Sequence, residues 1–184
     1  MAAAKHALVA MVTDRPGVLN RIASLFRRRG FNIESIAVGH SEVANVSRVT
    51  IVVDGTTTQV EQVRKQLEKV IEVIKVLDVT GDGTITRELA LIKVKTTADN
   101  RSEVMQIVDI FRAKIVDVSA DSVMVEVTGD GNKIDSLYRL LKGFGVREIA
   151  RTGTIAMTRG GPGALLAEDK KTETKAKSKK QPTK

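Results

Sequence analysis

The residues best suited to chemistry in this chain lie in two short polar runs near its N-terminus. Residues 13–20 read TDRPGVLN and join an expected strand to an expected helix, and residues 30–36 read GFNIESI and join that helix to the next strand. A helix N-terminus offers unpaired backbone N–H groups and partial positive charge, which together suit a carboxylate. We expect the two runs to face each other and form a polar notch that holds a free amino acid without reacting with it.

Each end of an amino-acid zwitterion finds a candidate partner in these runs. Backbone N–H groups near Gly17, Val18 and Leu19 would receive the carboxylate, and Gly17 has no Cβ atom to keep a ligand away from the backbone. The Asp14 carboxylate can accept from an ammonium group or from N–H groups of its own helix. The Asn32 amide can both donate and accept, so it could serve either end of the ligand.

Apolar residues beside the same runs could enclose a branched aliphatic side chain. These residues are Val18, Ile33 and Ile36. A purely structural role stays open, since an acid before Pro-Gly starts many helices and an asparagine can simply satisfy a loop. In the second half of the chain, the loop at residues 96–102 contains neither glycine nor proline, so we expect no amino-acid site there.

Residues for catalysis or metal binding are poorly represented. His6 and His40 are the two histidines, and neither has a nucleophile or metal ligand beside it in sequence. The absence of cysteine excludes disulfides and thiolate metal sites. The string VTGDG occurs at residues 79–83 and 127–131, and both copies are predicted to be turns, because neither matches a calcium loop or a phosphate loop. We predict no catalytic residue, metal or cofactor in this chain.

Hydrophobic periodicity predicts the same order of elements, βαββαβ, twice. The first unit spans residues 5–80, a linker covers 81–87, the second unit spans 88–159, and a Lys-rich tail, 160–184, is expected to be disordered. Right-handed crossovers turn each unit into a ferredoxin-like, four-stranded antiparallel sheet with two helices on one face. The fold class is therefore α+β. The opposite face of each sheet is expected to be bare, which favours a homodimer at least.

A few residues set the expected boundaries of these elements. Gly30 is expected to end the first helix in the left-handed conformation. Thr58 and Glu61 have the spacing of a capping box at the start of the second helix. Residues 146–157 are predicted to form the last strand, with a bend near Gly153.

Composition narrows the function class. The 184 residues carry a formal charge of +8, and residues 160–184 supply half of it, with seven Lys against three acidic residues. Aromatic residues make up only 3% of the chain, which makes nucleic-acid binding by a base-stacking sheet unlikely in comparison with a small-molecule site. No apolar stretch approaches the roughly 20 residues of a membrane span, and no signal peptide is evident. We expect a cytoplasmic protein.

Six motifs in order make the chain similar to a known family, and the match covers nearly all of residues 5–159. The motifs are DRPGVL at 14–19, RGFNIES at 29–35, SRVTI at 47–51, RELALIKV at 87–94, IFRAKIVDV at 110–118 and EIARTG at 148–153. They resemble the small, regulatory subunits of acetolactate synthase, also called acetohydroxyacid synthase. The first unit resembles an ACT domain, a βαββαβ module that often binds amino acids at a dimer interface.

The resemblance implies a regulatory subunit whose enzyme partner is a separate chain. That catalytic (large) subunit would hold thiamine diphosphate, magnesium and FAD, and would condense two pyruvates, or pyruvate with 2-oxobutyrate, in the synthesis of valine, isoleucine and leucine. The small subunit would raise this activity and confer feedback inhibition by valine bound between two ACT domains. Carried over to this chain, Gly17 and Val18 would receive the carboxylate, with Asp14 from the same loop and Asn32 and Ile33 from the partner. Alternatively, the chain is an ACT-type sensor for another enzyme or, less expected, a nucleic-acid module.

Family members often have asparagine where this chain has Asp14. An acid near a ligand carboxylate would repel it, unless Asp14 meets the ammonium group instead. The resemblance therefore leaves the identity of the effector and its affinity to experiment.

Overall fold

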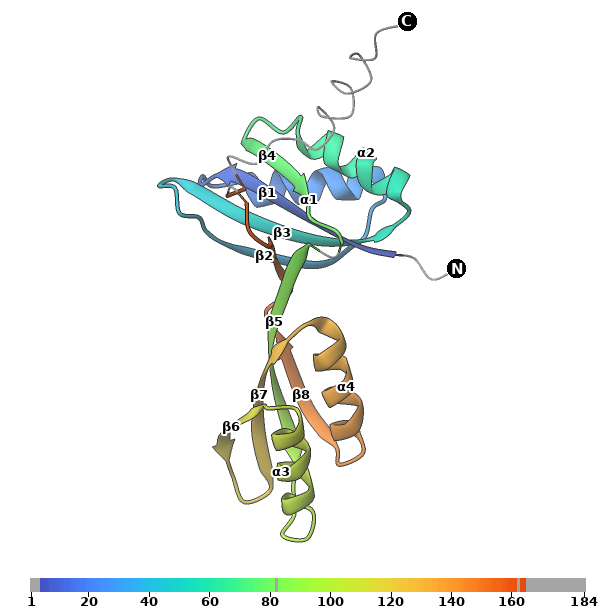
Figure 1. Ribbon diagram of the computed structural model, residues 1–184, viewed down its shortest axis with the longest axis vertical. Helices are drawn as coiled ribbons and strands as arrows, with labels where there is room; N and C mark the ends of the chain where they lie inside the picture. The colour runs from blue at the N-terminus through green and yellow to red at the C-terminus, as the bar shows by residue number, and fades with distance from the viewer. Residues whose placement is uncertain (1–3, 82, 162, 165–184) are drawn as a thin grey trace, which may run out of the picture.

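The computed structural model describes residues 4–81, 83–161, 163 and 164, which form two α+β modules joined end to end at a narrow waist (Figure 1). Most of the tail predicted to be disordered, residues 165–184, lies outside the described residues. The first module contains β1 (Ala4–Thr13), α1 (Val18–Arg29), β2 (Ile33–His40), β3 (Val46–Gly55), α2 (Thr57–Leu67) and β4 (Val73–Asp78). The second contains β5 (Thr84–Lys95), α3 (Arg101–Ile110), β6 (Lys114–Val118), β7 (Ser122–Gly129), α4 (Gly131–Lys142), β8 (Val146–Arg151) and β9 (Ile155–Thr158).

The first module has the predicted ferredoxin-like topology. Its sheet is antiparallel with the order β2-β3-β1-β4, and both helices cover one face (Figure 1). Alternate residues of β1 and β3, such as Leu8 and Ile51, pack beneath Ile22 and Phe26 of α1. Burial of this apolar surface is the main force that holds the helices to the sheet. The second module repeats this layout with the order β6-β7-β5-β8, again antiparallel, so the predicted α+β class is confirmed.

Helix boundaries in the first module follow from glycine and threonine. Gly17 at φ +88° begins α1 and Gly30 at φ +68° ends it, both in the left-handed region that favours glycine. The prediction for Gly30 is confirmed, since its N–H donates to the carbonyls at the C-terminal end of the helix. The capping box of α2, however, forms at Thr56 and Gln59 rather than at the predicted Thr58 and Glu61.

The connection between the modules is more ordered than the sequence indicated. Residues 84–87, which the sequence analysis assigned to a linker, form the first part of β5 and pair with β9. The predicted last strand, 146–157, divides into β8 and β9, with Gly153 at φ +81° between them, so the expected bend is present. The long strand β5 therefore serves two pairings, one with β9 and one within the second sheet.

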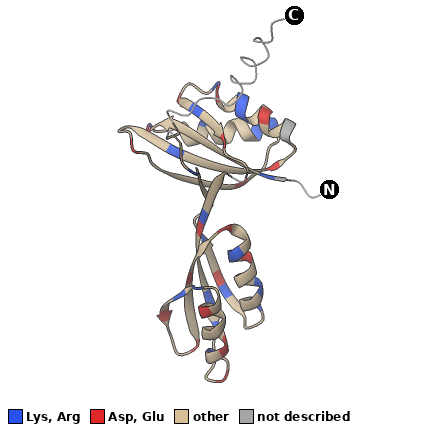
Figure 2. Ribbon diagram, in the orientation of Figure 1, with Lys and Arg blue, Asp and Glu red and all other residues tan. Residues whose placement is uncertain are grey.

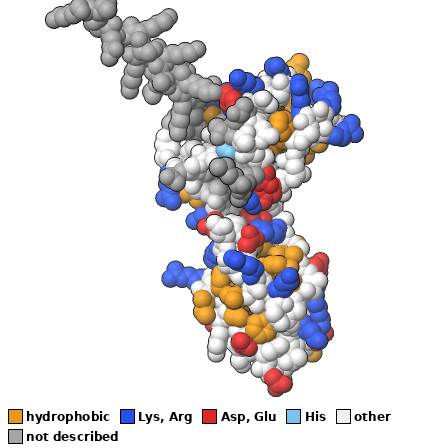
Figure 3. Space-filling view, turned by 90° about the vertical axis from the view of Figure 1, so that its right-hand side faces the viewer, with side chains coloured by type: hydrophobic (Ala, Val, Ile, Leu, Met, Phe, Trp, Pro, Cys, Tyr) orange, Lys and Arg blue, Asp and Glu red, His pale blue; other side chains and the backbone are white. Residues whose placement is uncertain are grey.

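The expectation of a bare sheet face is wrong for the first module. Ala156 of β9 is 3% exposed and packs with Val9, Met11, Val46 and Val79 on the face opposite the helices. This coverage was missed because Ala156 lies about 145 residues after Met11 of β1 and 110 residues after Val46 of β3. On the second module, Figure 3 shows hydrophobic side chains at the surface in view.

The second VTGDG copy is not the simple turn that the sequence analysis predicted. Its first residues end β7, Asp130 caps α4 by accepting from the N–H of Lys133, and Gly131 is the first residue of that helix. In the first copy, Asp82 lies outside the described residues. Within the part of the chain that the structure describes, no helix is long and apolar enough to cross a membrane. No group of three His, Asp or Glu residues there is placed to hold a metal ion.

Candidate functional site

The N-terminus of α1 has the open backbone that the sequence predicted. Gly17 is exposed, and a Cβ atom built on it would meet no atom within 4 Å among the described residues. No side chain caps the helix, and its first turn contains no acidic residue. Val18 N–H contacts the Arg15 carbonyl at 3.5 Å, the long limit of a hydrogen bond. The helix therefore presents backbone donors and positive potential to solvent, where an anion can bind.

Asp14 lies beside this helix end but does not cap it. Its backbone N–H donates to the Asn45 carbonyl at 2.8 Å, which fixes the loop against the start of β3. Its carboxylate lies 3.5 Å from Nδ1 of His40 at the end of β2. His40 is thus part of the site's surroundings although sequence reasoning did not include it. The pairing of β2 and β1 with the same strand, β3, brings the ends of both together.

The two polar runs do not form a notch within one chain. Ile33 pairs with Val53 near one end of β3, whereas Thr13 pairs with Val46 at its other end. The twelve residues of α1, about 18 Å of helix, separate the two runs. The prediction of a single-chain notch is therefore wrong. Strands β1 and β2 run in the same direction, so a helix between them must start at one end of the sheet and finish at the other.

The remaining predicted residues lie on β2, just before it, or in the first turn of α1. In the described chain, β2 is an edge strand with no neighbour beyond it. Ile36 and Val38 pair with core residues of β3, yet they stay 40% and 47% exposed at this edge. Leu19 on α1 is 47% exposed, whereas Val18 is buried in the core. Asn32 is exposed at the start of the strand. The edge thus combines free backbone groups with apolar side chains, which favours pairing with another strand.

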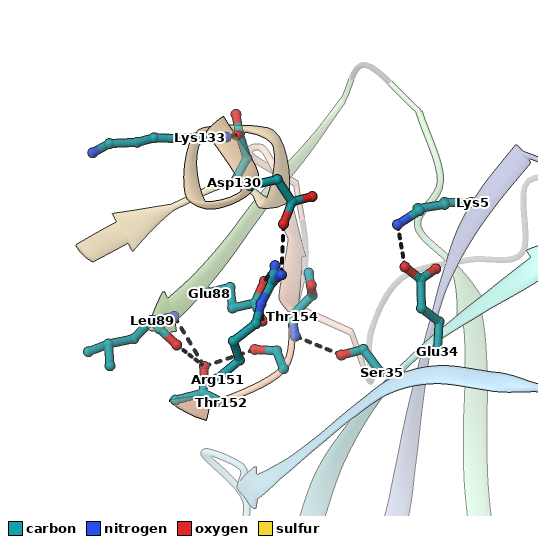
Figure 4. Close-up of polar contacts among 12 residues, drawn as sticks. Lys5, Glu34, Ser35, Glu88, Leu89, Asp130, Lys133, Arg151, Thr152 and Thr154 are labelled. Carbon is teal, nitrogen blue, oxygen red and sulfur yellow. Dashed lines mark hydrogen bonds and ion pairs between the residues drawn. The ribbon is translucent and has the colours of Figure 1, made fainter. Parts of the chain in front are cut away.

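A second polar region lies between the modules, in a cleft of about 690 Å³ that includes Ile36 in its lining. Arg151 on β8 donates to both oxygens of Glu88, at 2.6 and 2.7 Å (Figure 4). It also donates to Asp135 on α4 at 2.7 Å. Glu88 is 6% exposed. The hydrogen bonds that Arg151 donates to the Glu88 carboxylate raise the pKa of Arg151 above its ordinary value, although burial opposes the rise. Across the cleft, the pKa of Lys5 is raised chiefly by its hydrogen bond with Glu34.

The charged residues of this cleft are largely paired with each other. Elsewhere, basic and acidic residues are interspersed over the two modules (Figure 2). The bidentate geometry of Arg151 on Glu88 joins β8 to β5, and its third hydrogen bond joins them to α4. We interpret the cleft as a structural joint. The open helix N-terminus and the exposed β2 edge remain the features that are suited to ligand recognition.

The comparisons with known proteins assign both modules to one family. A family model described as the small subunit of acetolactate synthase matches residues 87–160. A second model, the ACT domain of acetohydroxyacid synthase small subunits, matches residues 8–75. The two matched regions correspond to the two modules.

Whole-length relatives share about half of their residues with this chain. The acetolactate synthase small subunit of Mycobacterium leprae is 54% identical over 155 residues, which are 84% of this chain and 92% of that protein. The Bacillus subtilis small subunit is 53% identical over 158 residues, 85% of this chain and 91% of the relative. The crystal structure of the Thermotoga maritima small subunit superposes with a TM-score of 0.80 at 42% identity, covering 86% of this chain and 99% of that one.

Proposed function

Since the chain belongs to the family of acetolactate synthase small subunits, we propose that it activates a separate catalytic subunit and makes it sensitive to valine. The observation that supports the proposal is the open N-terminus of α1 next to β2, an edge strand whose outer side has no neighbouring strand in the described chain. The helix N-terminus suits an amino-acid carboxylate, and the edge strand suits pairing with a second copy of the chain. Together they fit a site that is completed by dimerisation.

Pairing of two β2 strands would assemble the site that one chain lacks. In an antiparallel pair the start of one strand lies beside the end of the other. Asn32 and Ile33 lie at the start of β2, whereas Asp14 contacts His40 at its end. In such a pair, Asn32 and Ile33 of one copy would therefore approach residues 14–19 of the second copy. The exposed Ile36 and Val38 would be buried by the same pairing.

The residues around this assembled site match both ends of a zwitterion. The valine carboxylate would accept from the N–H groups at Gly17 and Val18. Asp14 would accept from the ammonium group, since its carboxylate is 48% exposed and lies 3.5 Å from Nδ1 of His40, which leaves room for a further donor. Ile33 would contact the branched side chain, and the Asn32 amide would complete the polar contacts. A ligand that bridges two chains stabilises one dimer arrangement in proportion to its differential affinity for that arrangement.

The chemistry of the reaction would reside in the partner. Thiamine diphosphate, magnesium and FAD would be held by the catalytic subunit, and this chain would contribute no group to the reacting atoms. Its effect on rate would be a coupling free energy between two sites, which is typically about 1–3 kcal/mol, or roughly 5–150-fold. This range is sufficient for feedback control of a biosynthetic step.

Calorimetry of the purified chain with valine, leucine and isoleucine tests the ligand, and acetolactate formation by the reconstituted complex tests the function. We expect valine to bind, and the chain to raise the catalytic rate in the absence of valine and lower it in its presence. A chain that binds none of the three amino acids, or that leaves the rate unchanged, would contradict the proposal. Binding without an effect on this enzyme would instead indicate an ACT-type sensor for another one.

The dimer is tested by a charge on the β2 edge. We expect Val38→Lys to give a folded monomer in sedimentation velocity, because two like charges would meet along the paired strands. Val116→Lys on edge strand β6 is the matched control, since Val116 is 49% exposed, and it should leave the dimer intact. Dimerisation of the Val38 variant at wild-type strength would exclude pairing through this edge.

A further inference from the structure

Residues 152–158, which we term the strap, leave the second module and cross the sheet of the first. On the second module the strap is anchored at Thr152, whose N–H donates to the Leu89 carbonyl at 3.0 Å and whose hydroxyl accepts from the Leu89 N–H at 3.1 Å. The adjacent Arg151 is held by Glu88 and Asp135. The strap therefore begins at a fixed point of the second module.

The strap then contacts β2, the strand that carries the proposed effector residues. The N–H of Thr154 donates to Oγ of Ser35 at 2.9 Å (Figure 4). Gly153 packs so closely that a Cβ atom on it would lie 2.9 Å from Ser35 Oγ and 3.0 Å from the Ile36 carbonyl oxygen. Close packing transmits displacement, because atoms already in contact cannot approach further. A shift of β2 at Ser35 would therefore move Gly153 and Thr154.

The remainder of the strap is fixed to the centre of the same sheet. Arg48 on β3 donates to the Ala156 carbonyl at 2.7 Å, and burial lowers the pKa of this guanidinium. Ala156 is buried against β1. Residues 155–158 also pair with residues 84–87 of β5. The strap thus contacts two strands of the same sheet. One is the edge strand β2, where the ligand is proposed to bind, and the other is the interior strand β3, which is held by neighbours on both sides.

We propose that the strap couples effector binding at the β2 edge to the position of the second module. This inference rests on the proposed function, because it assumes that an amino acid binds where β2 begins and ends. Valine that draws two β2 strands together would move Ser35 relative to β3. The Gly153–Thr154 contact would carry that movement along the strap to Thr152 and Arg151. The second module would then report valine binding to the catalytic subunit.

Two substitutions test the strap at its contact with β2. Ser35→Ala removes the acceptor of the Thr154 N–H, and Gly153→Ala inserts a Cβ atom where contacts of 2.9 and 3.0 Å leave no space. Gly145→Ala is the matched control. Gly145 also has a positive φ, +97°, and lies in the second module, but the nearest atom to its added Cβ is Cβ of Lys95 at 3.6 Å. The control shares the backbone strain without the contact with β2.

Three measurements on the full chain decide the outcome. We expect both strap variants to bind valine within about threefold of wild type by calorimetry and to activate the catalytic subunit. At saturating valine, however, their complexes should retain most of the valine-free rate, whereas the Gly145 variant should be inhibited like wild type. Hydrogen exchange of the Thr154 amide in wild type should slow several-fold when valine binds, and this change should be absent in Ser35→Ala.

Full inhibition of both strap variants would overturn the coupling role, as would an unchanged Thr154 exchange rate in wild type. Loss of valine binding in both variants would overturn it too, since the strap would then shape the site rather than transmit from it. A wild-type chain that fails to bind or respond to valine would instead contradict the proposed function itself.

Discussion

A comparison of Gly17→Asp with Gly17→Asn should test whether a ligand carboxylate binds at the N-terminus of α1, because the two variants differ mainly in charge. Gly17 has φ +88°, and no described atom lies within 4 Å of an added Cβ. A side chain can therefore be added without a clash, at a backbone cost of about 1–2 kcal/mol that is smaller for Asp and Asn. Gly17→Asp and Gly17→Asn have nearly the same shape and tolerate this conformation equally. The difference between them isolates the charge.

The magnitude follows from the geometry of the helix end. An Asp carboxylate at this position would lie about 4 Å from a ligand carboxylate held by the first-turn N–H groups. Two like charges at that distance repel by about 4 kcal/mol at an effective dielectric constant of 20. Because Gly17 is exposed to solvent, screening should reduce this to about 1.5–3 kcal/mol. The dissociation constant for valine should then be roughly 10- to 150-fold higher for the Asp variant than for the Asn variant.

The assay is calorimetric titration of valine into both variants at low and high salt, with circular dichroism to verify folding. The difference in valine affinity between the two variants should decrease as the salt concentration rises, because exposed charges are screened. In the reconstituted enzyme, the Asp variant should resist valine while still stimulating the catalytic subunit. Equal valine affinities for the Asp and Asn variants would refute the placement of the ligand carboxylate at this helix end.

Three further results are expected. Asn32→Ala should weaken valine inhibition without abolishing activation of the catalytic subunit, and an unchanged response would remove Asn32 from the site. Arg151→Met should lower the free energy of unfolding by about 2 kcal/mol in urea titrations, because the buried Glu88, 6% exposed, would lose its charged partner. The partial exposure of Arg151 limits this loss. A decrease below about 0.5 kcal/mol would refute the prediction. The Arg147 guanidinium lowers the pKa of Asp121, chiefly by a hydrogen bond, so this pair stabilises the fold above the ordinary Asp pKa and the contribution disappears as pH falls through the lowered value. Arg147→Ala should raise the Asp121 pKa toward its usual range in an NMR titration, and an unmoved midpoint would contradict the assignment.

Local patterns predicted most of the fold because the relevant interactions are local. Gly30 ends α1 by bonding carbonyls a few residues earlier. The helical spacing of Ile22 and Phe26 with Leu25 reflects one buried stripe. Leu19 has the same helical spacing from Ile22 and Phe26, yet it is 47% exposed and Val18 is buried instead. In the first turn of a helix, the residue that faces the core can differ by one position from the residue that the helical spacing predicts.

The capping box of α2 was misplaced by two residues, but the larger errors concern contacts between distant parts of the chain. The pairing of β9 with residues 84–87 joins segments about 70 residues apart. Residues 155–157 were predicted as part of a strand, but nothing local to the sequence indicates which strand they pair with. The approach of His40 to Asp14 depends on the register of two strands with β3. The supposed notch could have been rejected from topology alone, because a helix that joins two parallel strands cannot return to its own starting end.

The pairing of β9 with the first part of β5 makes residues 88–154 an insertion between two paired strand segments. Arg87 and Ile155 are partners across this ribbon, so the chain leaves and re-enters the ACT module at nearly the same point. Replacing residues 88–154 with a tight reverse turn would convert the ribbon into a hairpin. Ala156 would still cover the hydrophobic face formed by Val9 and Met11. A truncation before β9 would expose that face to water, so an autonomous effector-binding fragment should retain the last strand and omit the segment between.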